Sequence, residues 1–183
     1  KRGDSKLTLK QFGSAEVDFL KAIEINQELN KNGDTKNNSE LSKSYLGISH
    51  VHINNKEYQK AIEYLKKTIE LDRDDPDGFY KLAFVYNEKS EFFKAIEQIS
   101  ISISKSEESK LNNENYYISS IDDNVTRLSI EDLLILRAEI MYKISGKNKM
   151  SCDDLNRALE GSSDDKNKEK SGSIQKLIAQ TCN

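Results

Sequence analysis

The chain has 183 residues, of which 36% are hydrophobic and 32% charged, and its formal net charge is −3. Its length suits one domain or one segment of a repeat array, and its single Pro and 8 Gly favour a mostly helical chain. Acidic and basic residues are mixed, without the basic stripe that nucleic-acid binding requires. No apolar run approaches the roughly 18 residues of a membrane span. We therefore expect neither a nucleic-acid-binding nor a membrane-spanning protein. The chain begins at Lys1 rather than Met, so the lack of a visible signal peptide excludes nothing.

The first predicted helix begins at a cap on Ser14 and ends before Gly33. Its apolar residues recur near helical spacing: they are Val17, Phe19, Leu20, Ile23, Ile25 and Leu29. A polar turn over residues 30–38 follows it.

Further helices are expected at about residues 39–53 and 57–71, and from Pro76 to about Ser90. Pro76 fits the first turn of its helix because its missing N–H would have no partner there. The next segment is ambiguous, since Ile and Ser alternate over residues 99–104 as in a strand. The same isoleucines also fit one face of a helix, and the repeat described below requires a helix, so we predict one from Glu91 onward.

Residues 105–128 interrupt the helical pattern with a connection that is long for a compact domain. One interpretation is an extended helix end followed by a loop that lies on its own repeats. The other is a loop that reaches into the concave face or towards a partner. The sequence leaves both open.

The C-terminal part predicts three more helices. Ser129 and Asp132 form an approximate capping box for the first, which Gly146 ends. The second covers about residues 151–159, and a polar linker over residues 161–172 separates it from a last helix at 173–181.

An internal repeat organises the centre of the chain, because KAIE occurs at residues 60–63 and again at residues 94–97, a period of about 34 residues. The repeat extends to a pattern of large and small residues in two copies. One copy is Tyr45, Ile48, Ser49, His52, Ala61, Leu65 and Thr68, and the other is Phe79, Leu82, Ala83, Tyr86, Ala95, Ile99 and Ser102. Two partial copies flank them. These are Phe12, Ala15, Phe19 and Ala22 before, and Leu134, Arg137, Ala138, Met141, Ser151, Leu155 and Ala158 after, the latter with one inserted residue near 146–149.

This pattern and period resemble the tetratricopeptide repeat. The resemblance implies an all-α fold, a right-handed superhelix of antiparallel helix pairs with a C-terminal capping helix and a concave groove. We expect one domain over residues 1–183. Its parts are a partial repeat at about 1–38, repeats at about 42–75 and 76–109, an insert at about 105–128, a last repeat at about 129–162 and a capping helix at about 173–182. The first helix of the leading repeat is absent or truncated, which leaves room for further repeats before Lys1.

The C-terminal segment is similar to the end of small bacterial repeat proteins of the Bacteroidetes type. Cys152 and Cys182 are the only cysteines, and they lie at the start and after the end of two predicted helices. If those helices pack antiparallel, the sulfurs come within reach of a disulfide. The alternative is two free thiols in a cytosolic protein. We favour the disulfide and an extracytoplasmic location.

No motif for catalysis or for a cofactor is present. The chain lacks G-x-S-x-G, a phosphate-binding Gly loop and H-E-x-x-H. The two histidines, His50 and His52, are two residues apart on a helix and so face different ways, His52 towards the core and His50 towards the groove. We therefore predict a protein that is not an enzyme and has no metal site.

The resemblance implies that the first helix of each pair lines the groove, where a peptide or protein segment would bind. The positions that it assigns there are Lys43, Leu46, His50, Ile53, Asn54, Asp77, Tyr80, Phe84, Asn87, Glu88, Ile135, Glu139 and Tyr142. They lack the Lys and Asn set of repeat domains that clamp C-terminal carboxylates, which disfavours that partner. We predict an interaction scaffold. The alternative is a ligand-sensing or regulatory module of a larger bacterial signalling protein.

Overall fold

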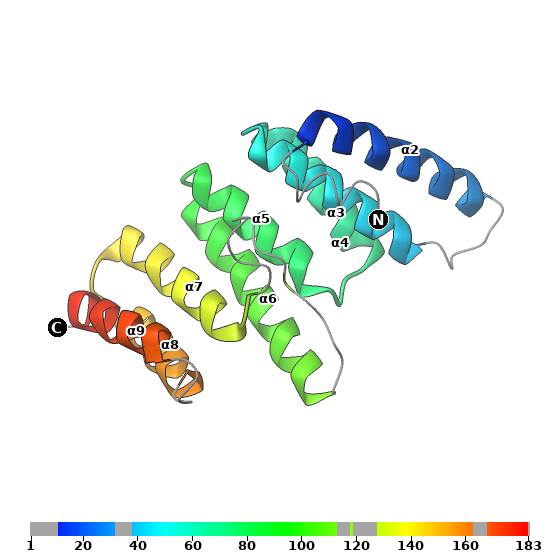
Figure 1. Cartoon of the computed structure of the whole chain (residues 1–183). Helices are drawn as coiled ribbons and strands as arrows, with labels where there is room; N and C mark the ends of the chain where they lie inside the picture. The colour runs from blue at the N-terminus through cyan, green and yellow to red at the C-terminus, as the bar shows by residue number, and fades with distance from the viewer. Residues whose placement is uncertain (1–10, 32–37, 113–117, 119–127, 163–167, 183) are drawn as a thin grey trace.

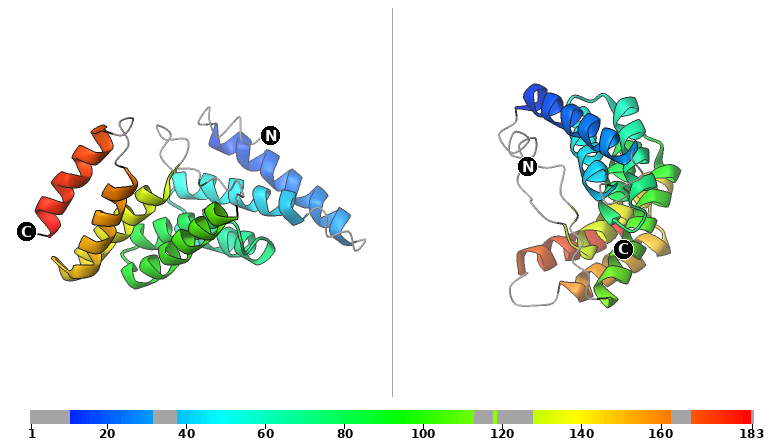
Figure 2. Two further views of the ribbon diagram at one scale, coloured as in Figure 1. Left: turned by 90° about the horizontal axis from the view of Figure 1, so that it is seen from below. Right: turned by 90° about the vertical axis from the view of Figure 1, so that its right-hand side faces the viewer.

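Helices that pack in chain order make up nearly all of the described chain. The structure is a computed structural model, and it describes residues 11–31, 38–112, 118, 128–162 and 168–182. Its helices are α2 (Phe12–Lys31), α3 (Asn38–Asn54), α4 (Tyr58–Leu71), α5 (Pro76–Glu88), α6 (Phe92–Leu111), α7 (Ile130–Ser145), α8 (Lys149–Gly161) and α9 (Lys168–Thr181). Each helix lies beside the next in a single row (Figure 1). The row curves, with α2 at one end and α9 at the other (Figure 2).

Small residues lie where the paired helices meet. Ala61, Ala95 and Ala158, on the second helices of the pairs α3–α4, α5–α6 and α7–α8, are completely buried. On α3, a side chain at Gly47 would clash with the ring of Phe19 on α2. Neighbouring helix backbones approach closely at these small residues. The larger apolar residues fill the space between successive helix pairs. The all-α solenoid of antiparallel pairs is confirmed.

The apolar interior forms three adjoining clusters along the row. The N-terminal core comprises Ala15, Phe19, Ile23, Leu41, Tyr45, Ile48 and Val51. The central core comprises Ile53, Ala61, Ile62, Leu65, Leu82 and Val85. The C-terminal core comprises Tyr80, Ala83, Ile99, Ile103, Ile118, Leu133, Leu134, Ala158 and Ile174. Each cluster contains residues from at least two helices. The apolar side chains of one helix are therefore buried only when a neighbouring helix packs against them.

The two central repeats share the same turn between their helices. Lys56 and Ser90, which occupy equivalent positions in the two repeats, both have φ of 59°. In each case the next residue, Glu57 or Glu91, donates its backbone N–H to a carbonyl five residues earlier at 2.8 Å. Each of these glutamates also accepts from a lysine three residues on, as in the pair of Glu57 with Lys60. The repeat visible as KAIE therefore extends to backbone geometry.

The ambiguous segment after Glu91 is helical, as predicted. Ile99 and Ile103 are buried in the C-terminal core, whereas Ile101 is partly buried. The helix α6 continues to Leu111, so the first seven residues of the predicted insert extend it. Of the remainder, the structure describes Asn112, which follows α6, and, further along the chain, Ile118 and Leu128. Ile118 and Leu128 form an isolated antiparallel bridge, and Ile118 is buried in the C-terminal core.

Three predicted helix starts are wrong. The helix α2 begins at Phe12, whose ring packs on the N-terminal core, so Ser14 lies inside the first turn and does not cap it. Asn148 caps α8 by accepting from the N–H of Ser151, and the helix starts at Lys149. The helix α9 begins at Lys168 rather than at 173. The capping box of Ser129 and Asp132 on α7 is confirmed.

Tertiary contacts account for the early start of α9. Lys170 pairs with Asp132 at 2.9 Å, and Ser171 donates to the carbonyl of Ser162 at 2.8 Å. These contacts order residues that the sequence pattern assigns to a polar linker. On the other side of α7, Arg137 binds both carboxylate oxygens of Asp154 on α8 at 2.7 Å. Arg137 also reaches Ser100 on α6 at 2.9 Å, so one side chain connects three helices.

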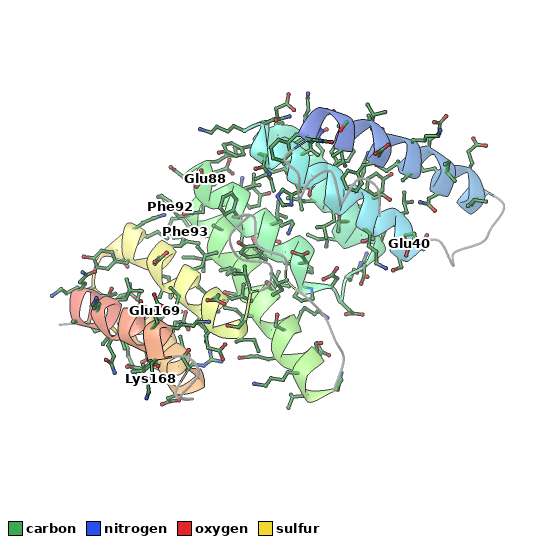
Figure 3. All side chains as sticks on the ribbon, viewed as in Figure 1. Glu40, Glu88, Phe92, Phe93, Lys168 and Glu169 are labelled. Atoms are coloured by element: carbon green, nitrogen blue, oxygen red, sulfur yellow. A yellow bond between two sulfur atoms is a disulfide. The ribbon has the colours of Figure 1, made fainter. Side chains whose placement is uncertain are left out.

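Cys152 near the start of α8 is joined to Cys182 after the end of α9, with Cα atoms 5.7 Å apart. The helices run antiparallel, which brings the start of one to the end of the other. At the opposite end of α9, Lys168 and Glu169 begin the helix (Figure 3). The capping helix is thus attached at both ends, by polar contacts at its start and by the disulfide at its end.

We predict that the Cys152→Ser, Cys182→Ser double variant unfolds in urea with about 3–4 kcal/mol less free energy of unfolding than the wild type. The disulfide joins residues with a sequence separation of 30. In the chain-entropy model, its loss raises the conformational entropy of the unfolded chain and so lowers the free energy of unfolding by that amount. Reducing agent should lower the stability of the wild type and leave the variant unchanged. Equal stability of the variant and the oxidised wild type would contradict the prediction.

We expect the carboxyl group of Asp75 to make the stability of the fold depend on pH. Its carboxylate caps α5 by accepting from the N–H of Asp77 at 2.9 Å. Burial raises its pKa from 3.8 to about 6, although the hydrogen bond from Asp77 acts in the opposite direction. Between these values the folded carboxyl keeps its proton while the unfolded one ionises. The contribution of Asp75 to stability is therefore fully present below about pH 4 and is lost as pH rises through about 6.

We predict that Asp75→Asn removes this dependence, because Asn caps helices well and does not titrate. From pH 4 to pH 7 the wild type should lose on the order of 2 kcal/mol of unfolding free energy relative to the variant. Urea unfolding followed by circular dichroism at both pH values measures this difference. A constant gap between the two proteins would show that Asp75 is not the group responsible.

Candidate functional site

The predicted groove positions on α3 lie in different environments. Lys43 is exposed and pairs with Glu40 at 3.1 Å (Figure 3 labels Glu40). Leu46, His50 and Asn54 are half-buried. Ile53, by contrast, is 4% exposed and belongs to the central core. This helix therefore offers a mainly polar strip and no apolar anchor.

The second histidine, His52, lies in the core as predicted. Its ring stacks on Tyr64 with centroids 5.4 Å apart, and its Nδ1 lies 2.7 Å from Glu57 Oε2. The side chain is 2% exposed. These contacts join α3 to α4, since Tyr64 lies within α4 and Glu57 immediately precedes that helix. His52 therefore stabilises the packing of the two helices.

On α5, the structure buries two positions that the sequence assigns to the groove. Asp77 is 4% exposed and accepts from Lys81 Nζ at 2.8 Å, within a pair that is almost wholly buried. Tyr80 is 6% exposed and lies in the C-terminal core, in one cluster with Ile118 of the insert. These two residues are part of the interior here and are not surface anchors.

The rest of α5 remains accessible to different degrees. Phe84 and Asn87 are half-buried, and exposed Glu88 accepts from the Tyr58 hydroxyl at 3.2 Å. Glu88 lies near the α5–α6 turn, next to Phe92 and Phe93 at the start of α6 (Figure 3). Asn87 accepts from Lys143 Nζ on α7 at 3.1 Å, which links the two repeats across the row.

On α7, two of the three predicted groove residues border a pocket. Ile135 is partly buried and packs on the C-terminal core, whereas Glu139 and Tyr142 are exposed. The pocket has a volume of about 250 Å³ and is bounded by α7, α8 and α9. Its lining residues are Ala138, Glu139, Tyr142, Lys143, Leu155, Leu177, Gln180 and Thr181.

Apolar groups make up most of this pocket, which we call the α7–α9 pocket. Leu177 forms one wall, Tyr142 is 43% exposed at the edge, and Leu155, also in the lining, is only 1% exposed. The α9 wall is fixed close to the disulfide, since Thr181 precedes Cys182 and its carbonyl lies 3.9 Å from Cys152 Sγ. A concave apolar surface with a few polar groups is the usual form of a ligand site.

The charge of the α7–α9 pocket comes from Glu139 and Lys143. Partial burial raises the pKa of Glu139, although the positive charge of Lys143 acts in the opposite direction. Lys143 extends away towards the preceding repeat, where its Nζ bonds Asn87 and lies 5.9 Å from the centroid of the Phe92 ring. Glu139 is therefore the negative group at the pocket itself.

Sequence reasoning found the α7 side of the pocket and missed the α9 side. The repeat pattern gives positions on α7, but α9 lies outside the repeats and was predicted five residues too short. The apolar spacing of Ile174, Leu177 and Ile178 was the available signal, and it shows a buried face without showing what borders it. Only the packing of α9 on α8 places Leu177 and Gln180 beside Tyr142.

Within the described ranges, no three acidic, His or Cys side chains gather in a way that would hold a metal ion. None of the described helices is both long and apolar enough to cross a membrane.

Comparison with known proteins agrees with this architecture. A family model described as tetratricopeptide repeat matches residues 42–75. Among solved structures, the N-terminal domain of stress-induced protein-1 (STI-1) from C. elegans is similar, with a TM-score of 0.55 and 15% identity. The similarity covers 75% of this chain and 97% of that one. Comparison with curated proteins gives no match.

The matched residues are those of the first complete repeat, which comprises α3 and α4. The structural similarity, at this low identity, concerns the fold. Residues 42–75 thus match a tetratricopeptide repeat, and the arrangement of the described helices is similar to that of this solved structure.

Proposed function

We propose that the protein is a non-catalytic scaffold that binds a peptide or protein segment, and that binding centres on the α7–α9 pocket. The observation that carries this proposal is the pocket itself. It combines two groove residues expected from the repeat, Glu139 and Tyr142, with a wall from the capping helix. Because the pocket lies between the last helix pair and the capping helix, it is a surface that no single repeat has.

Burial along the array favours this location over the central repeats. Tyr80 and Asp77 on α5 are covered, and Ile118 packs in the same cluster as Tyr80. On α7, by contrast, Tyr142 is exposed beside Leu155 and Leu177. Aromatic side chains that border an apolar pocket are typical anchors of protein interfaces.

The stability of the pocket walls also suits binding. The helix α9 is fixed by Lys170 at its start, by buried Ile174 in its middle and by Cys182 at its end. A wall that is already ordered loses little conformational freedom when a ligand binds, which preserves affinity.

We predict that peptides selected from a displayed random library on the wild-type protein lose affinity by about ten-fold on the Tyr142→Ala, Leu177→Ala double variant. The two changes remove the anchor and one wall, and interface anchors of this kind contribute more than about 1 kcal/mol each. Binding is measured by fluorescence anisotropy, and far-ultraviolet circular dichroism checks that the variant is folded.

The matched control is Phe93→Ala. Phe93 is an aromatic residue that is 78% exposed on α6 and lies outside the pocket lining. This variant should bind selected peptides like the wild type. Selected peptides that bind the double variant as tightly as the wild type would reject the α7–α9 pocket as the site, and failure to select any peptide would reject peptide binding.

A further inference from the structure

The α7–α9 pocket combines apolar walls with one acidic group. Half-buried Leu177 forms the α9 wall, Leu155 lies almost fully buried behind it, and the aromatic ring of Tyr142 lies at the edge. Glu139 is the carboxylate among the lining residues, one turn of α7 before Lys143. A ligand group that fits must therefore be apolar over most of its length and complementary to a negative charge at one point.

Lys143 does not meet this carboxylate at contact distance. Its Nζ is held 3.1 Å from Asn87 Oδ1, with the Phe92 ring nearby on α6. Glu139 makes no hydrogen bond or ion pair with any other residue that the structure describes. A carboxylate that is partly withdrawn from water without a contacting partner gains more from a cation than a fully solvated one does.

Lysine and arginine side chains have this combination of an apolar stem and a cationic end. We propose that the α7–α9 pocket accepts a lysine or arginine side chain of the bound peptide, with its stem against Tyr142 and Leu177 and its cation at the carboxylate of Glu139. This inference rests on the proposed function, since it specifies the side chain that the peptide site selects.

Other side chains fit less well. An acidic side chain would face Glu139 at short range and be repelled. A purely apolar side chain would fill the walls but remove water from the Glu139 carboxylate without replacing its hydrogen bonds. A short polar side chain would leave the apolar surface of Tyr142 and Leu177 uncovered.

The test is an NMR titration of the full chain with two small probes that share a four-carbon side-chain stem. One is Nα-acetyl-lysine N-methylamide, and the other is its norleucine counterpart, which has the stem without the charge. We expect the lysine probe to shift the amide signals of Leu177, Gln180 and Thr181 and to bind about five-fold more tightly than the norleucine probe, as for a partly exposed charge pair.

Glu139→Gln keeps the length of the side chain and removes its charge, and it should abolish the preference for lysine. Glu88→Gln is the matched control, because Glu88 is an exposed glutamate on α5 outside the pocket, and it should keep the preference. Both variants are checked for wild-type circular dichroism.

Two results would overturn the inference. If the norleucine probe binds as tightly as the lysine probe, or the preference survives Glu139→Gln, the pocket does not select a cation, while binding of peptides there stands. If neither probe shifts a pocket amide, the pocket does not take such a side chain, and the peptide selection with the Tyr142→Ala, Leu177→Ala variant decides the proposed function separately.

Discussion

Close approach of neighbouring helices at small residues is the constraint on which this structure depends. Ala61, Ala83 and Ala95 are completely buried, and Ala61 and Ala83 lie in core clusters that join neighbouring helices. Gly47 acts similarly, because its missing side chain leaves space for the ring of Phe19. Short distances between backbones allow each unit to cover the apolar face of the next, so the array has adjoining cores and no isolated unit.

The sequence predicts the bounds of those helices whose positions follow from the repeat. The period between the two KAIE copies placed α3, α4, α5 and the start of α6 within one or two residues of their observed bounds, although α6 ends well past residue 105. The repeat also overruled the strand-like alternation of residues 99–104. It failed for α9, whose first residues are polar and become helical through contacts such as Lys170 with Asp132. Local spacing carries no information about such distant partners.

The candidate site shows the same division. Repeat positions correctly identified Glu139 and Tyr142 as surface residues of α7, because the face of a helix follows from its register. The same reasoning predicted that Tyr80 would face the groove. Tyr80 is buried instead, in the same core cluster as Ile118, which lies beyond the end of α6. It also omitted Leu177, since the packing of a capping helix that lies outside the repeats cannot be read from the repeat pattern.

We propose that binding takes place where the repeats end. The last helix pair and the capping helix form an apolar pocket with one acidic group, and the bond of Cys152 to Cys182 holds its α9 wall in place. A crystal structure of the protein with a selected peptide tests this most directly. We expect electron density for the peptide between α7 and α9, with one of its side chains in contact with Tyr142 and Leu177. A peptide bound on the outer face of α2 or α6, with the pocket empty, would contradict it.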